Sequence, residues 1–188
     1  FLSLKLIIFK KGEFPTMVGI TMPLNDKLVV KFAFEHDLKN IVLALDSVKT
    51  SDNFTFSSPL AYNAIPDLLQ LRSSVFELGK IYFLLLDDTE TIRGIAEFET
   101  SAISRYITNS VAILSYVSCP SKNLDEFVKG CASLINKVAL CRTTKIRTYI
   151  PVDQPEAIES FSHSGFEKAA FLKEEYGKID VCMMDYFV

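Results

Sequence analysis

The spacing of apolar residues changes along the chain between two periods, one typical of strands and one typical of helices. Short runs rich in Val, Ile and Phe predict strands, whereas apolar residues at i, i+3, i+4 and i+7 predict the buried face of a helix. The predicted strands are Lys27–Glu35, Lys80–Leu86, Arg93–Thr100, Ser110–Val117, Lys145–Pro151, Phe166–Tyr176 and Ile179–Val188. The predicted helices are Leu38–Val48, Ala61–Leu78, Asn123–Cys141 and Gln154–Ser164. The segment Ser51–Pro59 is rich in turn-forming residues and is predicted to be a loop.

The order of these elements predicts the fold class. The strands that begin at Lys80 form a meander, after which strands and helices alternate. This order favours an α/β domain with a mixed, mostly antiparallel central sheet and helices on both faces. A chain of 188 residues supports one sizeable core, so we expect one domain over 27–188. Residues 1–26 are expected to be an N-terminal extension, either an added strand or a segment foreign to the natural protein.

Composition and charge argue against several functional classes. A net charge of −3 argues against a constitutive nucleic-acid binder, and two histidines argue against a His-rich metal centre. The four cysteines lie far apart and are expected to act as small apolar residues. No stretch reaches the roughly 20 apolar residues that span a bilayer. We therefore expect a cytoplasmic protein that does not act at a membrane.

The C-terminal stretch carries a pattern that can be compared with known families. Its spacing is N-x-x-A-x-x-x-Y-x-x-x-G-F, with Gln and Phe in place of Asn and Tyr, and a hairpin follows. The matching residues are Gln154, Ala157, Phe161, Gly165 and Phe166. This ending resembles that of the GNAT superfamily of acyl-CoA N-acyltransferases. The resemblance implies the acyl-CoA N-acyltransferase fold, acetyl-CoA as co-substrate, and a primary amine as acceptor.

The family's cofactor signature is R/Q-x-x-G-x-G/A at a helix start, where main-chain N–H groups hold the CoA pyrophosphate. One register places Gly130 and Ala132 on this signature, with Phe127 in place of Arg or Gln. The resemblance also places the pantetheine arm along the third meander strand. The residues so assigned to the cofactor are Tyr116, Val117, Ser118, Lys129, Gly130, Ala132, Gln154 and Phe161. Alternatively, Gly130 lies inside a helix capped by Asn123, whose acidic first turn repels a pyrophosphate.

Acyl transfer to an amine requires removal of a proton, because a free Lys amine has a pKa near ~10.4. Glu97 and Glu99 share one face of their strand and are the candidate bases; the alternative is a pair of solvated carboxylates. The family's usual acid, a Tyr, is Phe161 here, and a phenyl ring donates no proton. His163 is the nearby alternative acid, although a solvent-facing histidine is the simpler interpretation. The aromatic residues assigned either to an acceptor pocket or to the core are Phe54, Phe56, Tyr62 and Tyr106.

Three functions remain open at this point. The first is an N-acyltransferase that moves acetyl from acetyl-CoA to a primary amine by direct attack. The second is a GNAT-fold module that binds CoA or another ligand without turnover. The third is a partner-binding homodimer without CoA, in which Phe1–Leu24 adds an edge strand. The first requires that Ser110–Val117 and Lys145–Pro151 part at their ends and leave main-chain amides free for pantetheine.

Overall fold

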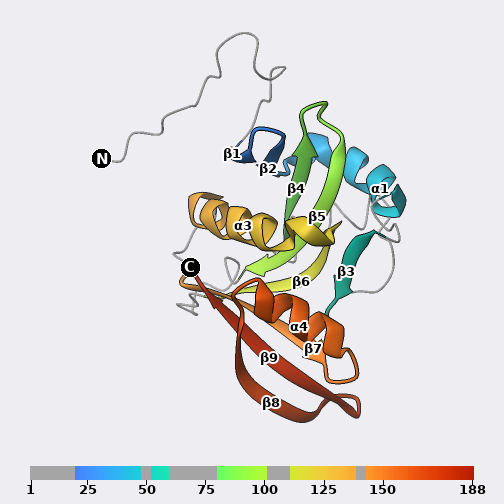
Figure 1. Cartoon of the computed structure of the whole chain (residues 1–188), viewed down its shortest axis with the longest axis vertical. Helices are drawn as coiled ribbons and strands as arrows, with labels where there is room; N and C mark the ends of the chain where they lie inside the picture. The colour runs from blue at the N-terminus through green and yellow to red at the C-terminus, as the bar shows by residue number, and fades with distance from the viewer. Residues whose placement is uncertain (1–19, 48–51, 60–79, 101–110, 139–142) are drawn as a thin grey trace.

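The computed structural model describes residues 20–47, 52–59, 80–100, 111–138 and 143–188 (Figure 1). The strands are β1 (Thr21–Asn25), β2 (Leu28–Phe32), β3 (Asn53–Ser57), β4 (Lys80–Asp87), β5 (Ile92–Thr100), β6 (Val111–Pro120), β7 (Lys145–Pro151), β8 (Glu167–Tyr176) and β9 (Ile179–Phe187). The helices are α1 (Leu38–Ser47), α3 (Leu124–Val138) and α4 (Pro155–His163), with 3-10 turns η1 (Glu35–Asp37) and η3 (Ser121–Asn123). Within these ranges, no helix combines the length and the apolar content needed to cross a bilayer.

The strands form one sheet in the order β1-β2-β4-β5-β6-β7-β9-β8, and β3 pairs with β6 off this path. Among the described strands, β6 and β7 are the one parallel pair, and every other pair is antiparallel. The predicted mixed, mostly antiparallel sheet is therefore confirmed.

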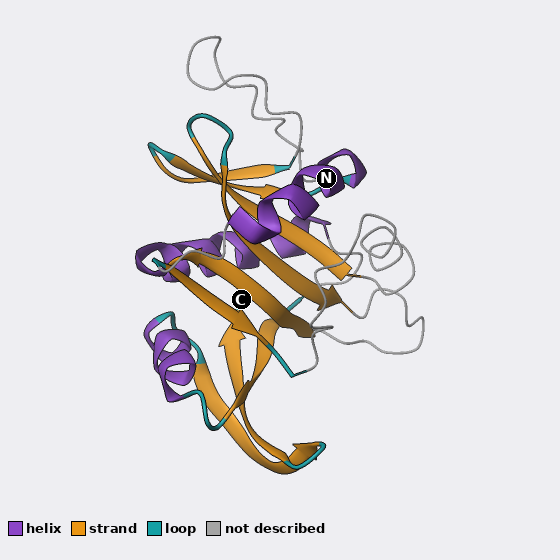
Figure 2. Cartoon of the chain, turned by 90° about the vertical axis from the view of Figure 1, so that its right-hand side faces the viewer, coloured by secondary structure: helices purple, strands orange, loops and turns teal. Residues whose placement is uncertain are grey.

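Helices cover both faces of this sheet (Figure 2). Along β4, Phe83 and Leu85 point into the larger core, which includes residues of α3 and α4. The alternate residues Tyr82 and Leu84 point to the other face and pack with residues of α1. Because successive side chains of a strand point to opposite faces, α1 lies on one side of the sheet and α3 and α4 lie on the other.

Two strands fall outside the predicted strand ranges, although an added strand was one of the two alternatives for residues 1–26. β1 falls within the predicted extension and pairs with β2, with Thr21 opposite Lys31. β3 falls within the predicted loop Ser51–Pro59. Its residues alternate between polar and aromatic, and this period-two signal is only five residues long. The predicted helix Ala61–Leu78 lies outside the described residues.

Gly130 lies in the middle of α3, where the helix packs on the β1–β2 hairpin. A Cβ at this position would lie 2.6 Å from Val30 Cγ2 and 2.7 Å from Leu24 Cδ2. We therefore expect Gly130→Ala to lower the free energy of unfolding by about 1 kcal/mol, because overpacking outweighs the gain in helix propensity. Urea denaturation would measure this loss of stability. Ser133→Ala, on the exposed face of α3, is the control; a stabilised Gly130→Ala protein would contradict this packing.

Candidate functional site

The central feature of the site is the place where β6 and β7 part. The two strands pair at three positions, from Val111 opposite Lys145 to Ile113 opposite Arg147. Immediately beyond, the Thr148 hydroxyl donates a hydrogen bond of 3.1 Å to the Leu114 carbonyl. The side chain thus satisfies a main-chain acceptor at the point where strand pairing ends. The strands part, which is the first of the two conditions that the N-acyltransferase interpretation sets.

The gap beyond this point is occupied by β3. Tyr116, Val117 and Ser118 have Cα partners in both β5 and β3, and a strand has only two hydrogen-bonding edges. β5 therefore takes one edge of β6, and β7 and β3 share the other (Figure 1). The main-chain groups that were expected to be free consequently pair with a segment of the same chain.

The contacts of β3 are continuous along the end of β6. The pairing runs from Asn53 opposite Pro120 to Ser57 opposite Tyr116. The Ser58 N–H then donates to the Ser115 carbonyl at 2.8 Å. Because alternate residues of a strand direct their main-chain groups to the same edge, the main chain of Val117 also faces β3.

Aromatic side chains fill the space between β3 and α4. Phe161 of α4 is fully buried at 0% exposure. Its ring contacts Phe54 and Phe56 of β3 edge-on, with centroid separations of 5.5 and 5.1 Å. Phe166 contacts the same ring at 5.1 Å. Phe161, which stands where the family has a Tyr, therefore packs against β3, and Phe54 and Phe56 belong to or border the main core.

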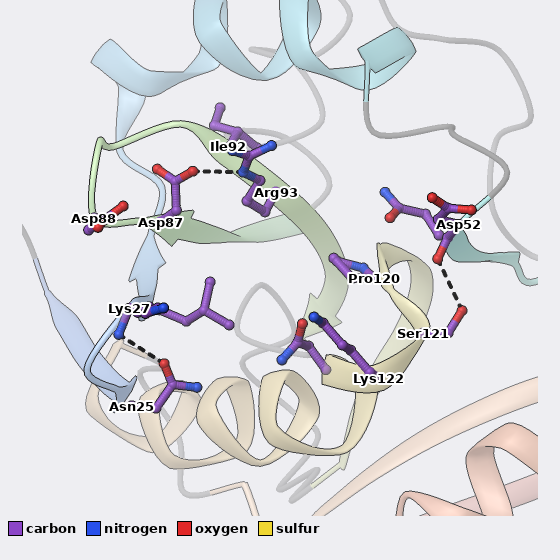
Figure 3. Close-up of a pocket in the computed structure, with 13 residues that line it drawn as sticks. Asn25, Lys27, Asp52, Asp87, Asp88, Ile92, Arg93, Pro120, Ser121 and Lys122 are labelled. Carbon is purple, nitrogen blue, oxygen red and sulfur yellow. Dashed lines mark hydrogen bonds and ion pairs between the residues drawn. The ribbon is translucent and has the colours of Figure 1, made fainter.

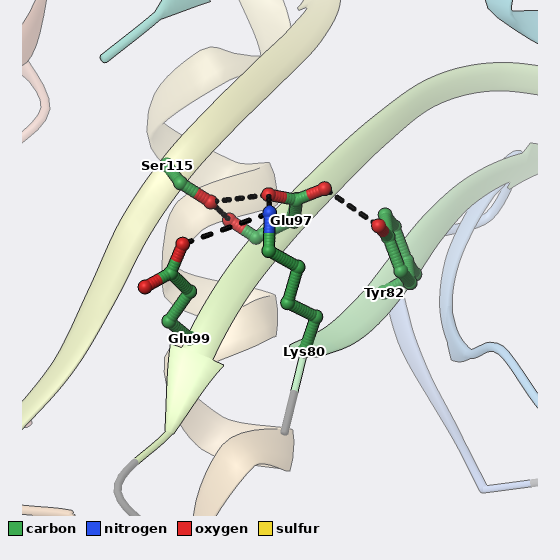
Figure 4. Close-up of polar contacts among 5 residues, drawn as sticks. All are labelled: Lys80, Tyr82, Glu97, Glu99 and Ser115. Carbon is green, nitrogen blue, oxygen red and sulfur yellow. Dashed lines mark hydrogen bonds and ion pairs between the residues drawn. The ribbon is translucent and has the colours of Figure 1, made fainter. Parts of the chain in front are cut away.

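A β-bulge lies beside the parting of β6 and β7. Glu97 is opposite Tyr116 and Phe98 is opposite Leu114, so Ser115 is the extra residue of β6. The Ser115 hydroxyl donates to the Glu97 carboxylate at 2.7 Å (Figure 4). The bulge thus brings a carboxylate of the neighbouring strand to the part of β6 where β7 has departed.

Glu97 is held by two further donors from β4. Lys80 Nζ lies 2.7 Å from Oε1, and the Tyr82 hydroxyl donates to Oε2 at 2.6 Å (Figure 4). The Glu97 side chain is 12% exposed, whereas that of Glu99 is 33% exposed and lies 3.6 Å from Lys80. The structure thus brings the two predicted carboxylates together around one buried ammonium group.

The side chain of Tyr116 lies on the same face as Glu97. Its hydroxyl oxygen is buried. Burial raises the pKa of this phenol, a hydrogen bond with Ser118 works against the shift, and the charge of Glu97 adds to it. Tyr116 is thus a buried, protonated neighbour of the Glu97 carboxylate.

A cavity of about 910 Å³ lies at the junction of β6 and α3, bounded by the turns of the β1–β2 and β4–β5 hairpins (Figure 3). Its lining contains both cations and carboxylates. The charged residues are Lys27, Arg93, Lys122, Asp52, Asp87 and Asp88. Burial tends to raise the pKa of Asp87, but hydrogen bonds from Thr89, Arg93 and Thr91 lower it to about 2. Asp87 is therefore ionised and organises its own turn.

The predicted cofactor motif lies inside α3 rather than at its start. Gly130 and Ala132 are buried in the helix interior, and Lys129 forms an ion pair with Asp125 at 2.8 Å. The first turn of α3 carries Asp125 and Glu126. Main-chain N–H groups inside a helix bond to its own carbonyls, so they are not available to a pyrophosphate.

The remaining predicted residues lie at the periphery or outside the description. Gln154 precedes α4, and its N–H donates to the Pro151 carbonyl at 3.0 Å. His163 is exposed at the last position of α4. Gly165 has a φ of 87°, as expected for a glycine that ends a helix. Tyr62 and Tyr106 lie outside the described residues.

The fold is similar to that of spermidine N-acetyltransferase from Vibrio cholerae. A dodecameric structure of that enzyme in an intermediate state has a TM-score of 0.59 and 17% identity, covering 87% of this chain and 95% of that one. A chimera of the same enzyme has a TM-score of 0.60 and 16% identity, covering 85% and 95%. A mutant form has a TM-score of 0.58 and 18% identity, covering 87% and 95%. No family model and no curated protein matches the chain.

At these identities the likeness establishes the fold. This chain has the GNAT acyl-CoA N-acyltransferase fold, as its C-terminal pattern predicted.

Proposed function

We propose that this chain transfers an acetyl group from acetyl-CoA to a primary amine by direct attack. The observation that carries the proposal is the Glu97 carboxylate beside the Ser115 bulge, next to the parting of β6 and β7. The fold shared with spermidine N-acetyltransferases supports the class of reaction. A carboxylate at this place can accept the proton that the amine must lose.

Among the described residues, the neighbours of Glu97 leave one position of its carboxylate open. An ionised carboxylate has about four lone-pair sites, and Lys80, Tyr82 and Ser115 address three of them. The fourth can accept a hydrogen bond from the incoming amine. Glu99, which is more exposed, adds negative charge that attracts a protonated amine to this face.

The residues around the gap do not fit acetyl-CoA in the described conformation. The amides of a pantetheine arm need main-chain partners, and β3 pairs with the edge of β6 that would supply them. Asp125 and Glu126 in the first turn of α3 repel a pyrophosphate. Acetyl-CoA can bind at this edge only if β3 leaves it.

A second candidate function is a module of the same fold that binds a ligand without turnover. The acidic first turn of α3 favours it, as does Phe161, which replaces the family's acid and packs on β3. Loss of that acid weakens catalysis without abolishing it, because a thiol of pKa near ~8.5 is a tolerable leaving group unaided.

One assay separates the two candidates. The full chain is incubated with acetyl-CoA and either spermidine, a lysine-containing peptide, or a tertiary amine that cannot form an amide. Release of free thiol and the mass of the amine are followed together. The enzyme should release thiol only with a primary amine and give the acetylated product. Binding of acetyl-CoA by calorimetry without amine-dependent thiol release would favour the module.

A further inference from the structure

The position of β3 has a regulatory consequence, which rests on the proposed function. β3 pairs with Tyr116, Val117 and Ser118, the three residues assigned to the pantetheine arm. It does so on the edge of β6 that β7 leaves. We propose that β3 is a built-in competitor of acyl-CoA, so that the chain binds acyl-CoA only when β3 has left β6.

The side chains of β3 close the gap as well as its main chain. Phe56 is buried at 2% exposure and its ring lies 5.1 Å from that of Phe161. Phe54 lies on the same face at 5.5 Å. An acyl chain that entered the gap between β6 and β7 would meet these two rings. β3 therefore blocks the site by its hydrogen bonds and by its volume.

The attachment of β3 is limited enough to be reversible. β3 has five residues and pairs with β6 along one edge. Only Phe56 of the five is buried, and Thr55 is exposed. On the opposite edge of β6, β5 pairs along the strand and is itself held by β4. Departure of β3 would thus leave the sheet intact.

This arrangement predicts a weak apparent affinity. A ligand that binds only the open state has its apparent dissociation constant raised by the inverse of the open fraction. Anything that holds β3 away from β6 should therefore raise the affinity for acyl-CoA and, with it, the rate at limiting acyl-CoA. The strand would act as the regulatory element of the site.

Thr55 and Ser118 provide a direct test. Their hydroxyl oxygens lie 2.8 Å apart, so cysteines at both positions place two sulfur atoms within bonding reach. In the double variant Thr55→Cys/Ser118→Cys, oxidation locks β3 on β6 and reduction releases it. Among the described residues, Cys119, Cys131 and Cys182 are buried, and burial raises the pKa of the Cys119 thiol to about 12, which keeps it unreactive. Cys141 lies outside the described residues, and the single variants below control for it.

The measurement is calorimetric binding of acetyl-CoA, which carries no free thiol to reduce the disulfide. We expect the oxidised double variant to bind at least about tenfold more weakly than the same protein after reduction. The single variants Thr55→Cys and Ser118→Cys, and the unaltered chain, should not respond to reductant. Equal binding by the oxidised and reduced forms would overturn the proposal, as would the absence of binding by both.

Acetyl transfer by the same samples distinguishes this inference from the proposed function. If the reduced protein binds acetyl-CoA but acetylates no amine, competition by β3 stands and the transferase assignment fails. If the oxidised protein acetylates an amine as fast as the reduced one, the assignment stands and competition by β3 fails.

Discussion

Replacing Glu97 with Gln should lower kcat for acetyl transfer by about 10²–10⁴-fold, the range typical of general acid–base catalysis. Gln is close in shape to Glu and keeps an oxygen that can accept from Ser115 or Tyr82. It cannot take a proton from the amine. Because Glu97 lies beside the bulge and not along the edge of β6 that we propose binds pantetheine, the KM for acetyl-CoA should change little. Steady-state kinetics with a primary amine would measure both parameters.

Glu99→Gln is the matched control for this prediction. Glu99 lies on the same strand and face, but its contact with Lys80 is 3.6 Å, compared with 2.7 Å for Glu97. We expect its main effect to be on the KM for the amine. Equal losses of kcat in the two variants, or a Glu97→Gln enzyme with unaltered kcat, would show that Glu97 is not the base. Far-ultraviolet circular dichroism would confirm that each variant is folded.

Asp185→Asn should lower the free energy of unfolding by about 3 kcal/mol, because removal of one partner leaves two cations without a counter-charge. Arg147 donates to the Asp185 carboxylate from Nε at 2.7 Å and from a terminal nitrogen at 2.9 Å. Lys145 Nζ donates to it at 2.8 Å. Asp185 is nearly buried, while the two cations are 22% and 24% exposed, which places the cost at the lower end for buried pairs. Urea denaturation gives the value.

An exposed ion pair is the control for Asp185. Asp125→Asn removes the partner of Lys129 on the surface of α3, and such pairs contribute only about 0.3–0.5 kcal/mol. If Asp185→Asn and Asp125→Asn lowered the free energy of unfolding by similar amounts, the role given to the ion pairs of Asp185 with Arg147 and Lys145 would be contradicted.

The ion pairs of Asp185 should also make the stability of the protein depend on pH. Hydrogen bonds from Arg147 lower the pKa of Asp185 below its ordinary value. Its contribution is therefore fully present above the unfolded pKa of about 3.9 and is lost as the pH falls through the lower folded pKa. Denaturation between neutral pH and acid should show a smaller acid loss in Asp185→Asn than in the unaltered chain. An identical acid loss would contradict the assignment.

The longer elements could be predicted from the sequence because their periods are sustained. The runs that became β4 and α3 carry a clear signal over eight and fifteen residues. β3 carries a clean alternation over only five residues, flanked by turn formers. A strand this short forms because it pairs with the edge of β6 that β7 leaves, and its own residue pattern is too short to predict it. The position of that edge cannot be seen in the sequence.

The candidate site was predicted in part. Glu97 and Glu99 follow from their shared strand face, but their partners Lys80, Tyr82 and Ser115 were missed. Lys80 and Tyr82 lie opposite Glu99 and Glu97, but a register shift between Leu85 and Leu86 separates them from the hairpin turn, so counting from the turn would have misplaced them by one residue. Ser115 likewise meets Glu97 through a bulge that shifts the register. The spacing of Gly130 matched the cofactor signature. In the structure, the position instead lies against Val30, where there is little room for a side chain.

The account depends most on competition between β3 and acyl-CoA for one edge of β6, and amide hydrogen exchange at Val117 measures that competition. With saturating acetyl-CoA, we predict that the amides of Phe54 and Phe56, which face β6, lose protection while that of Val117 stays protected, because one partner has replaced another. Bound acetyl-CoA with unchanged protection at Phe54 and Phe56 would contradict the account.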